Sequence, residues 1–154
     1  MKRLRWDRIS TLTSRTELIE ILNRRLAGLR DGDPALLLVH LDGGGFEMTT
    51  GIKLDIPFPD FGATIKGWEL VADQSGSLVI DLWKDSYGNY PPTVADTITA
   101  SAKPTLSSAA KNRALEVPTW GAGRIIRQGE TIRVNIDSVS GITRATLGLS
   151  LVKA

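Results

Sequence analysis

The residues that could carry out acid–base or metal chemistry are few in this chain of 154 residues, and the only histidine is His40. A Ser-His-Asp triad would have to use it, but His40 lies in the apolar run 36–41 with no nucleophile motif nearby. A zinc site needs three or four His, Cys or carboxylate ligands, and the chain has no cysteine. We therefore expect His40 to be a structural or surface strand residue, and we expect no metal and no cofactor.

Carboxylate chemistry is harder to exclude, because a glycosidase needs only a pair of carboxylates. Asp81, Asp85 and Asp96 lie around an aromatic segment of the chain. Acidic residues are nevertheless ordinary in loops and on solvent-exposed strand faces. The run Gly43-Gly44-Gly45 also lacks the Lys-Ser/Thr pair of a phosphate-binding loop. The sequence therefore predicts a protein that is not an enzyme.

Three aromatic residues, Trp83, Tyr87 and Tyr90, form the most distinctive group, in a stretch that also contains the rigid pair Pro91-Pro92. Aromatic rings on a loop could form a platform that contacts a host-surface glycan or a neighbouring subunit. Alternatively, the rings and prolines could pack down on one end of the fold, which is the interpretation that we favour. The three aromatic residues are the candidate ligand or subunit contacts.

The first element that the sequence predicts is an α-helix at 14–29, because Ser14 and Glu17 have the spacing of a capping box. Apolar residues at alternating spacings of three and four would form a seam for another helix. Two heptads do not prove a coiled coil, and the helix could instead lie on the surface of the following domain. We expect residues 1–33 to be an arm for attachment and oligomerisation. Its seam residues are Ile19, Leu22, Leu26 and Leu29.

The predicted arm is also basic: residues 1–30 contain eight Lys or Arg and three acidic residues, whereas the rest contains eleven and fourteen. Such an arm could bind nucleic acid, dock on an acidic protein surface or stay solvated. Trp6 is its only aromatic residue, which argues against nucleic acid. No apolar run approaches the ~20 residues of a membrane span, and the basic start lacks the apolar stretch of a signal peptide. We expect no membrane contact and synthesis in the cytoplasm.

The residues after the arm, 34–154, have the composition and the apolar–polar pattern of a β-rich domain. Short β-prone segments alternate apolar and polar residues, and most of the fifteen glycines and seven prolines lie at the breaks between them. Gly67 suggests a bulge in one segment. About eight antiparallel strands in two packed sheets, a β-sandwich, would fit this pattern. The predicted strands are 35–41, 51–56, 64–72, 77–84, 96–101, 113–117, 130–137 and 142–152.

Several of these segments resemble a domain of bacteriophage virion proteins of the tail, baseplate and head-fibre kind, which is also found in prophage-derived hypothetical proteins. The resemblance covers roughly residues 50–154, and its most specific block runs from 79 to 96. One departure is Gly121-Ala122-Gly123, which follows Trp120 where a plainer polar strand is expected. The matching segments are 67–68, 72–77, Val79-Ile80-Asp81-Leu82-Trp83-Lys84-Asp85, 90–96, 103–104, 119–120 and 135–138.

The resemblance implies a jelly-roll-like sandwich, commonly assembled as a homotrimer on the particle, with no catalytic residues to carry over. We therefore expect a non-catalytic structural subunit of a bacteriophage or phage-like particle, located in the virion and made in the host cytoplasm. The arm at 1–33 would contact other virion proteins, and the sandwich at 34–154 would be displayed. The alternative is a carbohydrate- or receptor-binding module that uses the loop at 83–90.

Overall fold

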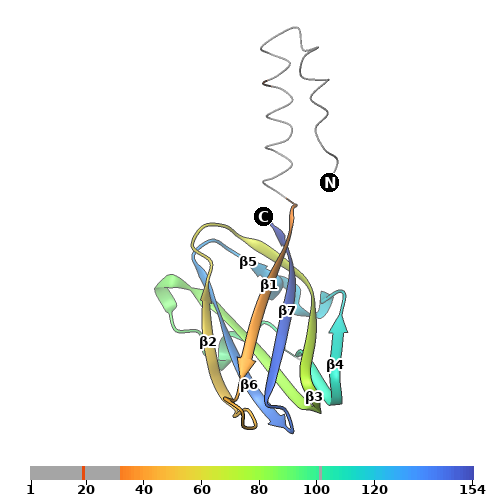
Figure 1. Cartoon of the computed structure of the whole chain (residues 1–154). Coiled ribbons are helices and arrows are strands. Elements are labelled where there is room, and N and C mark those ends of the chain that lie inside the picture. Colours follow the sequence, from red (N-terminus) through yellow and green to blue (C-terminus); the bar gives the residue numbers. More distant parts are fainter. Residues whose placement is uncertain (1–18, 20–31, 101) are drawn as a thin grey trace, which may run out of the picture. The chain divides into compact units, whose positions relative to one another are not determined.

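The computed structural model describes residues 19, 32–100 and 102–154 (Figure 1). The predicted helix and its seam residues Leu22, Leu26 and Leu29 lie outside the described residues, while Ile19 is helical and partly exposed. The chain divides after Asp33, and the unit from Pro34 to Ala154 forms the β domain.

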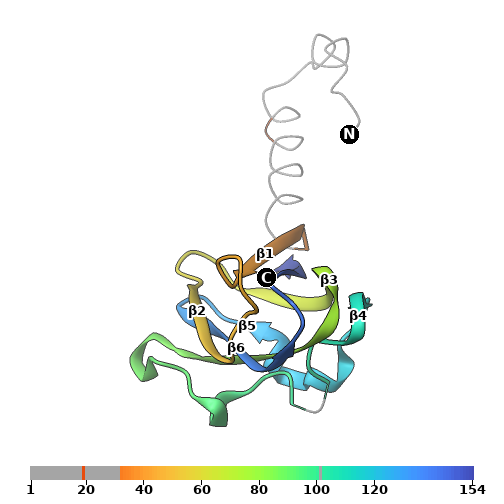
Figure 2. The ribbon, with the colours of Figure 1, turned by 60° about the horizontal axis from the view of Figure 1, so that its bottom comes forward.

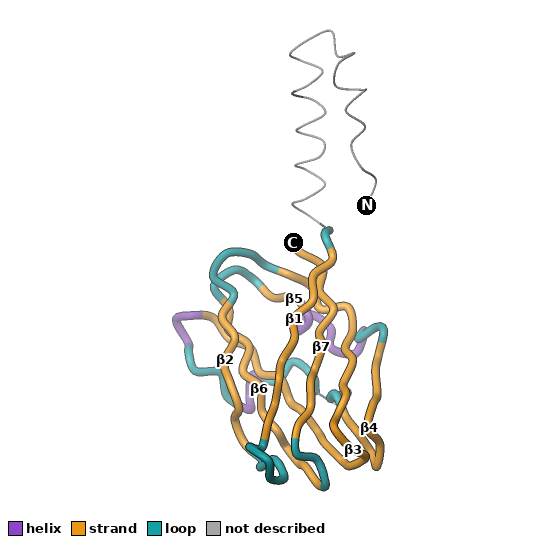
Figure 3. Tube along the Cα trace, in the orientation of Figure 1, coloured by secondary structure: helices purple, strands orange, loops and turns teal. Residues whose placement is uncertain are grey.

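The β domain is one curled antiparallel sheet of seven strands among the described residues, which confirms a mainly β, antiparallel fold. The strands follow the order β1-β7-β3-β6-β2, while β4 and β5 also pair with β3. Short 3-10 turns, purple in Figure 3, lie in the connections: η2 (Tyr87–Asn89), η3 (Val94–Asp96) and η4 (Pro118–Arg124). The strands are β1 (Pro34–Asp42), β2 (Gly51–Pro57), β3 (Ala63–Ser86), β4 (Thr105–Ala114), β5 (Ile125–Ile126), β6 (Glu130–Ser140) and β7 (Arg144–Lys153).

The 24-residue strand β3 organises the whole sheet. Residues 63–72 of β3 pair with β7 and residues 77–86 pair with β6, while β4 pairs along the opposite edge. We call β1, β7 and the first part of β3 the first half-sheet, and β2, β6 and the last part of β3 the second half-sheet. Figure 2 shows how the sheet curls around between the two. The strands predicted at 64–72 and 77–84 are therefore one continuous strand.

The corner between the half-sheets is held by side chains of β3 and by the turn that joins β6 to β7. Asp73 accepts hydrogen bonds from the amides of Thr143 (3.2 Å) and Arg144 (3.1 Å), and from the Thr143 hydroxyl. Gly76 lies so close to this turn that a Cβ would be 2.6 Å from Ile142 Cγ1. The missing side chain at Gly76 lets the fully buried Ile142 close the corner.

The core lies inside the curl and follows the predicted alternation. Leu78, Ile80 and Leu82 of β3 are fully buried on one face, and the pairing of β3 with β7 shifts register between Ile65 and Gly67. The predicted bulge at Gly67 is thus confirmed, and it moves the following residues into phase with the core. The largest fully buried side chains are Ile65, Leu70, Leu78, Ile80, Leu82, Leu106, Ile126, Ile132, Ile136, Ile142, Leu147 and Leu149.

Two predicted strands are wrong. The described residues of the segment 96–101 contain the end of η3 and pair with β3 through an isolated antiparallel bridge from Thr97 to Trp83, so they form no strand. Of the strand expected at 113–117, only the first two residues belong to a strand, β4, which runs from Thr105 to Ala114 and pairs with β3; residues 115–117 lie beyond its end. The stretch that was missed is rich in Ser, Ala, Lys and Asn, which have low β-propensity, and the edge of β3 supplies the pairing that makes it a strand.

Candidate functional site

The outer face of the second half-sheet contains most of the polar side chains that the sequence marks as candidates. Register pairs Trp83 with Arg133 and Asp81 with Asn135 on neighbouring strands β3 and β6. The connection that follows β3 borders this face: the amide of Ile98 donates to the Leu82 carbonyl at 2.8 Å along the edge of β3. The Pro92 carbonyl accepts from the Arg133 side chain of β6 at 3.2 Å, which brings the connection over the outer side chains. A face that alternation predicts to be solvent-exposed is therefore covered.

Among the charged side chains of 32–100 and 102–154, Asp81 is the most deeply buried, with 1% of its surface exposed. It accepts hydrogen bonds from the hydroxyls of Thr97 (2.5 Å) and Thr99 (2.6 Å), and its second oxygen lies 3.0 Å from Lys103 Nζ. Burial raises the pKa of Asp81, but the hydrogen bonds from Thr97 and Thr99, helped by Lys103, outweigh it and leave the pKa below its usual value. Asp81 is therefore ionised, and it anchors the segment that contains Thr97, Thr99 and Lys103, which we call the covering segment.

Lys103 joins Asp81 to a second carboxylate. Its Nζ lies 2.7 Å from Asp137 Oδ2, and Asn135 Nδ2 donates to the other oxygen of Asp137 at 2.8 Å. The hydrogen bond to Asp137 and the contact with Asp81 raise the pKa of Lys103 despite partial burial. A protonated lysine between two carboxylates forms an ion-pair network that fastens Lys103 to β3 and β6. It is not arranged as an amine nucleophile, because a nucleophile needs the neutral form.

A second polar cluster holds the candidate residue Tyr90. Arg133 binds Asp55 of β2 through two nitrogens, at 2.7 and 2.8 Å, and donates to the Pro92 carbonyl at 3.2 Å. The Tyr90 hydroxyl donates to Asp55 at 2.8 Å, and its ring centroid lies 5.6 Å from the Arg133 guanidinium carbon. The hydrogen bonds from Arg133 lower the pKa of Asp55. Tyr90 is thus fixed through one bidentate ion pair.

The three candidate aromatic residues do not form one platform. Trp83 is 9% exposed, and its buried indole N–H meets the geometry of a hydrogen bond with no described residue, although its interaction with Asp81 helps to lower the pKa of that carboxyl. Tyr87 is 86% exposed in η2, and Tyr90 is half-exposed. Only the two tyrosines are therefore presented to solvent.

The candidate carboxylates each serve a different local structure. Asp85 accepts from the Ser86 amide at 2.7 Å and from Asn89 at 3.2 Å. Asp96 accepts from the amide and the hydroxyl of Thr93, both at 2.8 Å, and these bonds lower its pKa. Together with the pairing of Asp81, this arrangement gives each carboxylate a structural partner.

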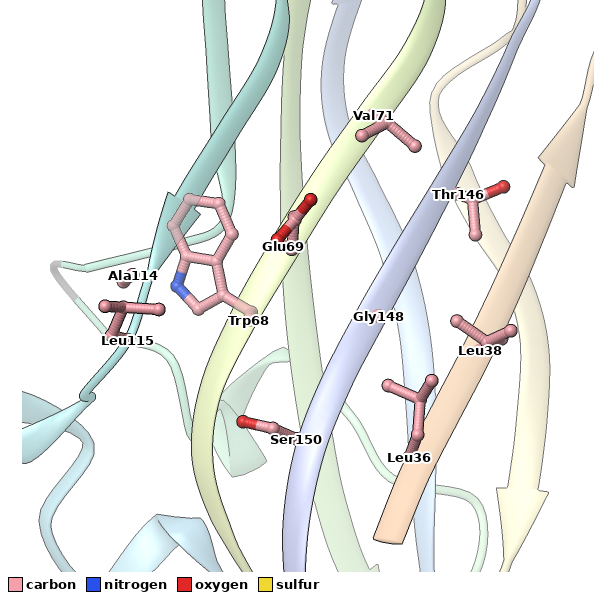
Figure 4. A pocket seen from close by; sticks show the side chains of 10 residues that line it. All are labelled: Leu36, Leu38, Trp68, Glu69, Val71, Ala114, Leu115, Thr146, Gly148 and Ser150. Atoms are coloured by element: carbon pink, nitrogen blue, oxygen red, sulfur yellow. The ribbon is translucent and has the colours of Figure 1, made fainter.

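A shallow apolar groove, which the sequence prediction missed, lies on the outer face of the first half-sheet (Figure 4). Its floor is the small-residue side of β7, and leucines of β1 stand along one wall. Its volume is about 360 Å³. The available signal was the run 34–41, which is apolar at nearly every position and not merely at alternate ones. The groove is lined by Leu36, Leu38, Trp68, Glu69, Val71, Ala114, Leu115, Thr146, Gly148 and Ser150.

The remaining candidate, His40, lies on the same face, where its Nδ1 is 3.0 Å from the Thr146 hydroxyl. Within 32–100 and 102–154 no three His, Cys, Asp or Glu side chains gather as a metal site would require. No helix in the described part of the chain is long and apolar enough to cross a membrane. No protein-family model and no curated protein matches this chain.

Proposed function

We propose that the chain is a non-catalytic structural subunit of a bacteriophage or phage-like particle, a component of its tail, baseplate or fibre. Residues 1–33 would anchor it to other virion proteins, and the β domain, as a jelly-roll-like sandwich, would be displayed on the virion. The subunit would be a homo-oligomer, with a trimer favoured.

One observation supports this proposal most directly. Several polar residues in the part of the chain that resembles phage virion domains, roughly 50–154, are used to fasten the chain to itself. Asp81 and Lys103 join the covering segment to the sheet, and Tyr90 is bonded to Asp55. Internal pairing of these polar side chains suits a durable building element better than a reaction centre, where donors and acceptors are kept free for a substrate.

The solution mass of the full chain, compared with that of residues 34–154, tests the proposal. A trimer that becomes a monomer without the arm would support assembly through residues 1–33. Monomers in both cases would contradict the structural-subunit function and would favour a binding module. A second test uses an antibody to the β domain. The antigen should sediment with particles from a culture of the source strain, and its absence from the particle fraction would contradict a virion location.

The alternative function is a carbohydrate- or receptor-binding module, and the exposure of two tyrosines favours it. Tyr87 projects from η2, and Tyr90 is held in one position by Asp55 and Arg133. A preorganised ring beside a freely exposed one is a common arrangement for stacking on a sugar. Glycan binding by the full chain that is lost in Tyr87→Ala but kept in Val94→Ala, also at an exposed position, would support this module.

A further inference from the structure

The strand β1 has an unusual composition for the edge of a sheet. It pairs with β7 and with no other described strand, so its second edge is open. Val39 and Leu41 point into the core, while Leu36 and Leu38 point outward and are 66% and 51% exposed. Within β1, no residue before Asp42 carries a charge at neutral pH, His40 being counted as neutral. Natural edge strands are normally protected by lysines, bulges or short length, because an open apolar edge leads to aggregation.

The outward leucines form one wall of the groove on the first half-sheet. Leu38 pairs with Gly148 on β7, and a Cβ at Gly148 would lie 3.5 Å from Leu38 and 3.6 Å from Leu36. Both leucines therefore lie over the glycine and stay in van der Waals contact with the floor. On the other side of the groove, Val71 and Leu115 are also exposed (Figure 4). The result is a firm, hollowed apolar surface.

Polar groups surround this apolar centre. Glu69 is opposite Arg113 in the register of β3 with β4, and His40 is bonded to Thr146. An apolar centre with a polar rim is the usual anatomy of a protein interface.

We infer that this apolar face, formed by Leu36, Leu38, Val71 and Leu115 around Gly148, is buried against a second copy of the same chain. The inference rests on the proposed structural-subunit function and names the surface through which the β domains assemble. The arm predicted to self-associate ends where β1 begins, so Leu36 lies only two residues beyond Pro34. β domains whose arms associate would be held near one another at a high effective concentration.

A second copy of the chain is present whenever the protein is made, whereas an occasional partner is not. The open edge and the leucines of β1 are exposed in the folded β domain at all times, and permanent interfaces are the most apolar ones. Another copy of the chain is always synthesised in the same amount.

The absence of cysteine from the sequence makes a direct test available. In the full chain, Leu36→Cys and the matched control Val94→Cys, each at a site that is 66% exposed in the isolated domain, are labelled with a maleimide. We expect Cys at 36 to react at least tenfold more slowly than Cys at 94. The protection should disappear on dilution, together with the oligomer mass.

The outcomes separate this inference from the proposed function. An oligomeric mass with equal labelling rates overturns the inference alone, whereas a monomeric mass with equal rates overturns both. Protection that persists in the monomer also overturns the inference, because the chain would then cover its own face. In addition, Leu36→Lys with Leu38→Lys should weaken association at least tenfold, unlike Phe46→Lys on an exposed loop. An unchanged mass profile for the double variant would overturn the inference.

Discussion

Replacing Asp81 by asparagine should destabilise the β domain strongly, although the two side chains have nearly the same shape. Asp81 accepts from three donors with two oxygens: the hydroxyls of Thr97 and Thr99 and the ammonium of Lys103. An asparagine offers one acceptor oxygen and an amide that is itself a donor. In one orientation the amide would face the ammonium of Lys103; in the other, the hydroxyls of Thr97 and Thr99 would have to accept from it and turn their own hydrogens away. Both orientations remove the negative charge opposite Lys103 in a site that is 1% exposed.

The expected loss follows from these contacts. A hydrogen bond to a charged group contributes about 1.5–3 kcal/mol, and an unsatisfied buried polar group costs about 1–3 kcal/mol. The side chain of Lys103 is 27% exposed, so solvent screens part of its interaction and the lower halves of these ranges apply. We therefore expect Asp81→Asn to lower the free energy of unfolding by about 3 kcal/mol. Asp137→Asn, at a carboxylate that is 30% exposed, should cost about 1 kcal/mol or less.

Denaturant unfolding of the full chain measures both variants, and hydrogen exchange gives a local readout. Exchange in the covering segment 97–103 should accelerate in Asp81→Asn, because its anchor is lost. Lys103→Met added to Asp81→Asn should cost less than the sum of the two single changes, since methionine removes the opposing donor. If Asp81→Asn is as mild as Asp137→Asn, or if the two changes are additive, the pairing assigned to Asp81 is wrong.

Three further predictions concern the same fold. Arg133→Lys keeps the charge but loses the bidentate contact with Asp55, so the free energy of unfolding should fall by about 1–2 kcal/mol. NMR should also show a more mobile Tyr90 ring, and an unchanged stability would contradict this role. Asp55, Asp73 and Asp81 have lowered pKa values, so these carboxyls bind fewer protons in the folded than in the unfolded chain. The stability that they contribute is therefore present above the unfolded pKa of about 4 and is lost as the pH falls through their folded pKa values. The denaturant midpoint should drop between pH 7 and pH 3, and a flat profile would refute the assignment. Gly76→Ala should cost about 1–3 kcal/mol, because its Cβ would lie 2.6 Å from Ile142 and from a backbone carbonyl; Gly88→Ala, at a position open to solvent, is the matched control and should stay within about 0.5 kcal/mol.

The parts of the fold that the sequence predicted correctly depend on local periodicity. Leu78, Ile80 and Leu82 recur at every second residue, and a pleated strand necessarily turns them to one face. Gly67 interrupts the alternation of apolar and polar residues earlier in β3, and the pairing of β3 with β7 shifts its register at this point. These signals are local, so they can be seen without knowing any partner strand.

The features that were missed depend on distant segments. The stretch between residues 73 and 76 looks like a turn, yet it remains within β3 because the hairpin of β6 and β7 binds both of its flanks. The candidate site shows the same limitation. Alternation places Asp81 and Trp83 on a solvent-exposed face, but a segment some 16 residues further along the chain covers them. Periodicity describes a strand's two faces and does not reveal which one another segment will cover.

The pairing pattern of β1 and β2 has a consequence for the order of events during synthesis. β1 pairs with β7 and β2 with β6, so the strands synthesised first have partners among those synthesised last. Sheets dominated by such distant pairings fold slowly, and domains emerging from the ribosome expose their apolar segments until the partners arrive. The leucine-rich β1 must therefore remain unpaired while more than a hundred residues follow it. A ribosome-bound chain halted before Arg144 should consequently be sensitive to protease throughout β1, and chaperone binding to this segment should end once β7 emerges.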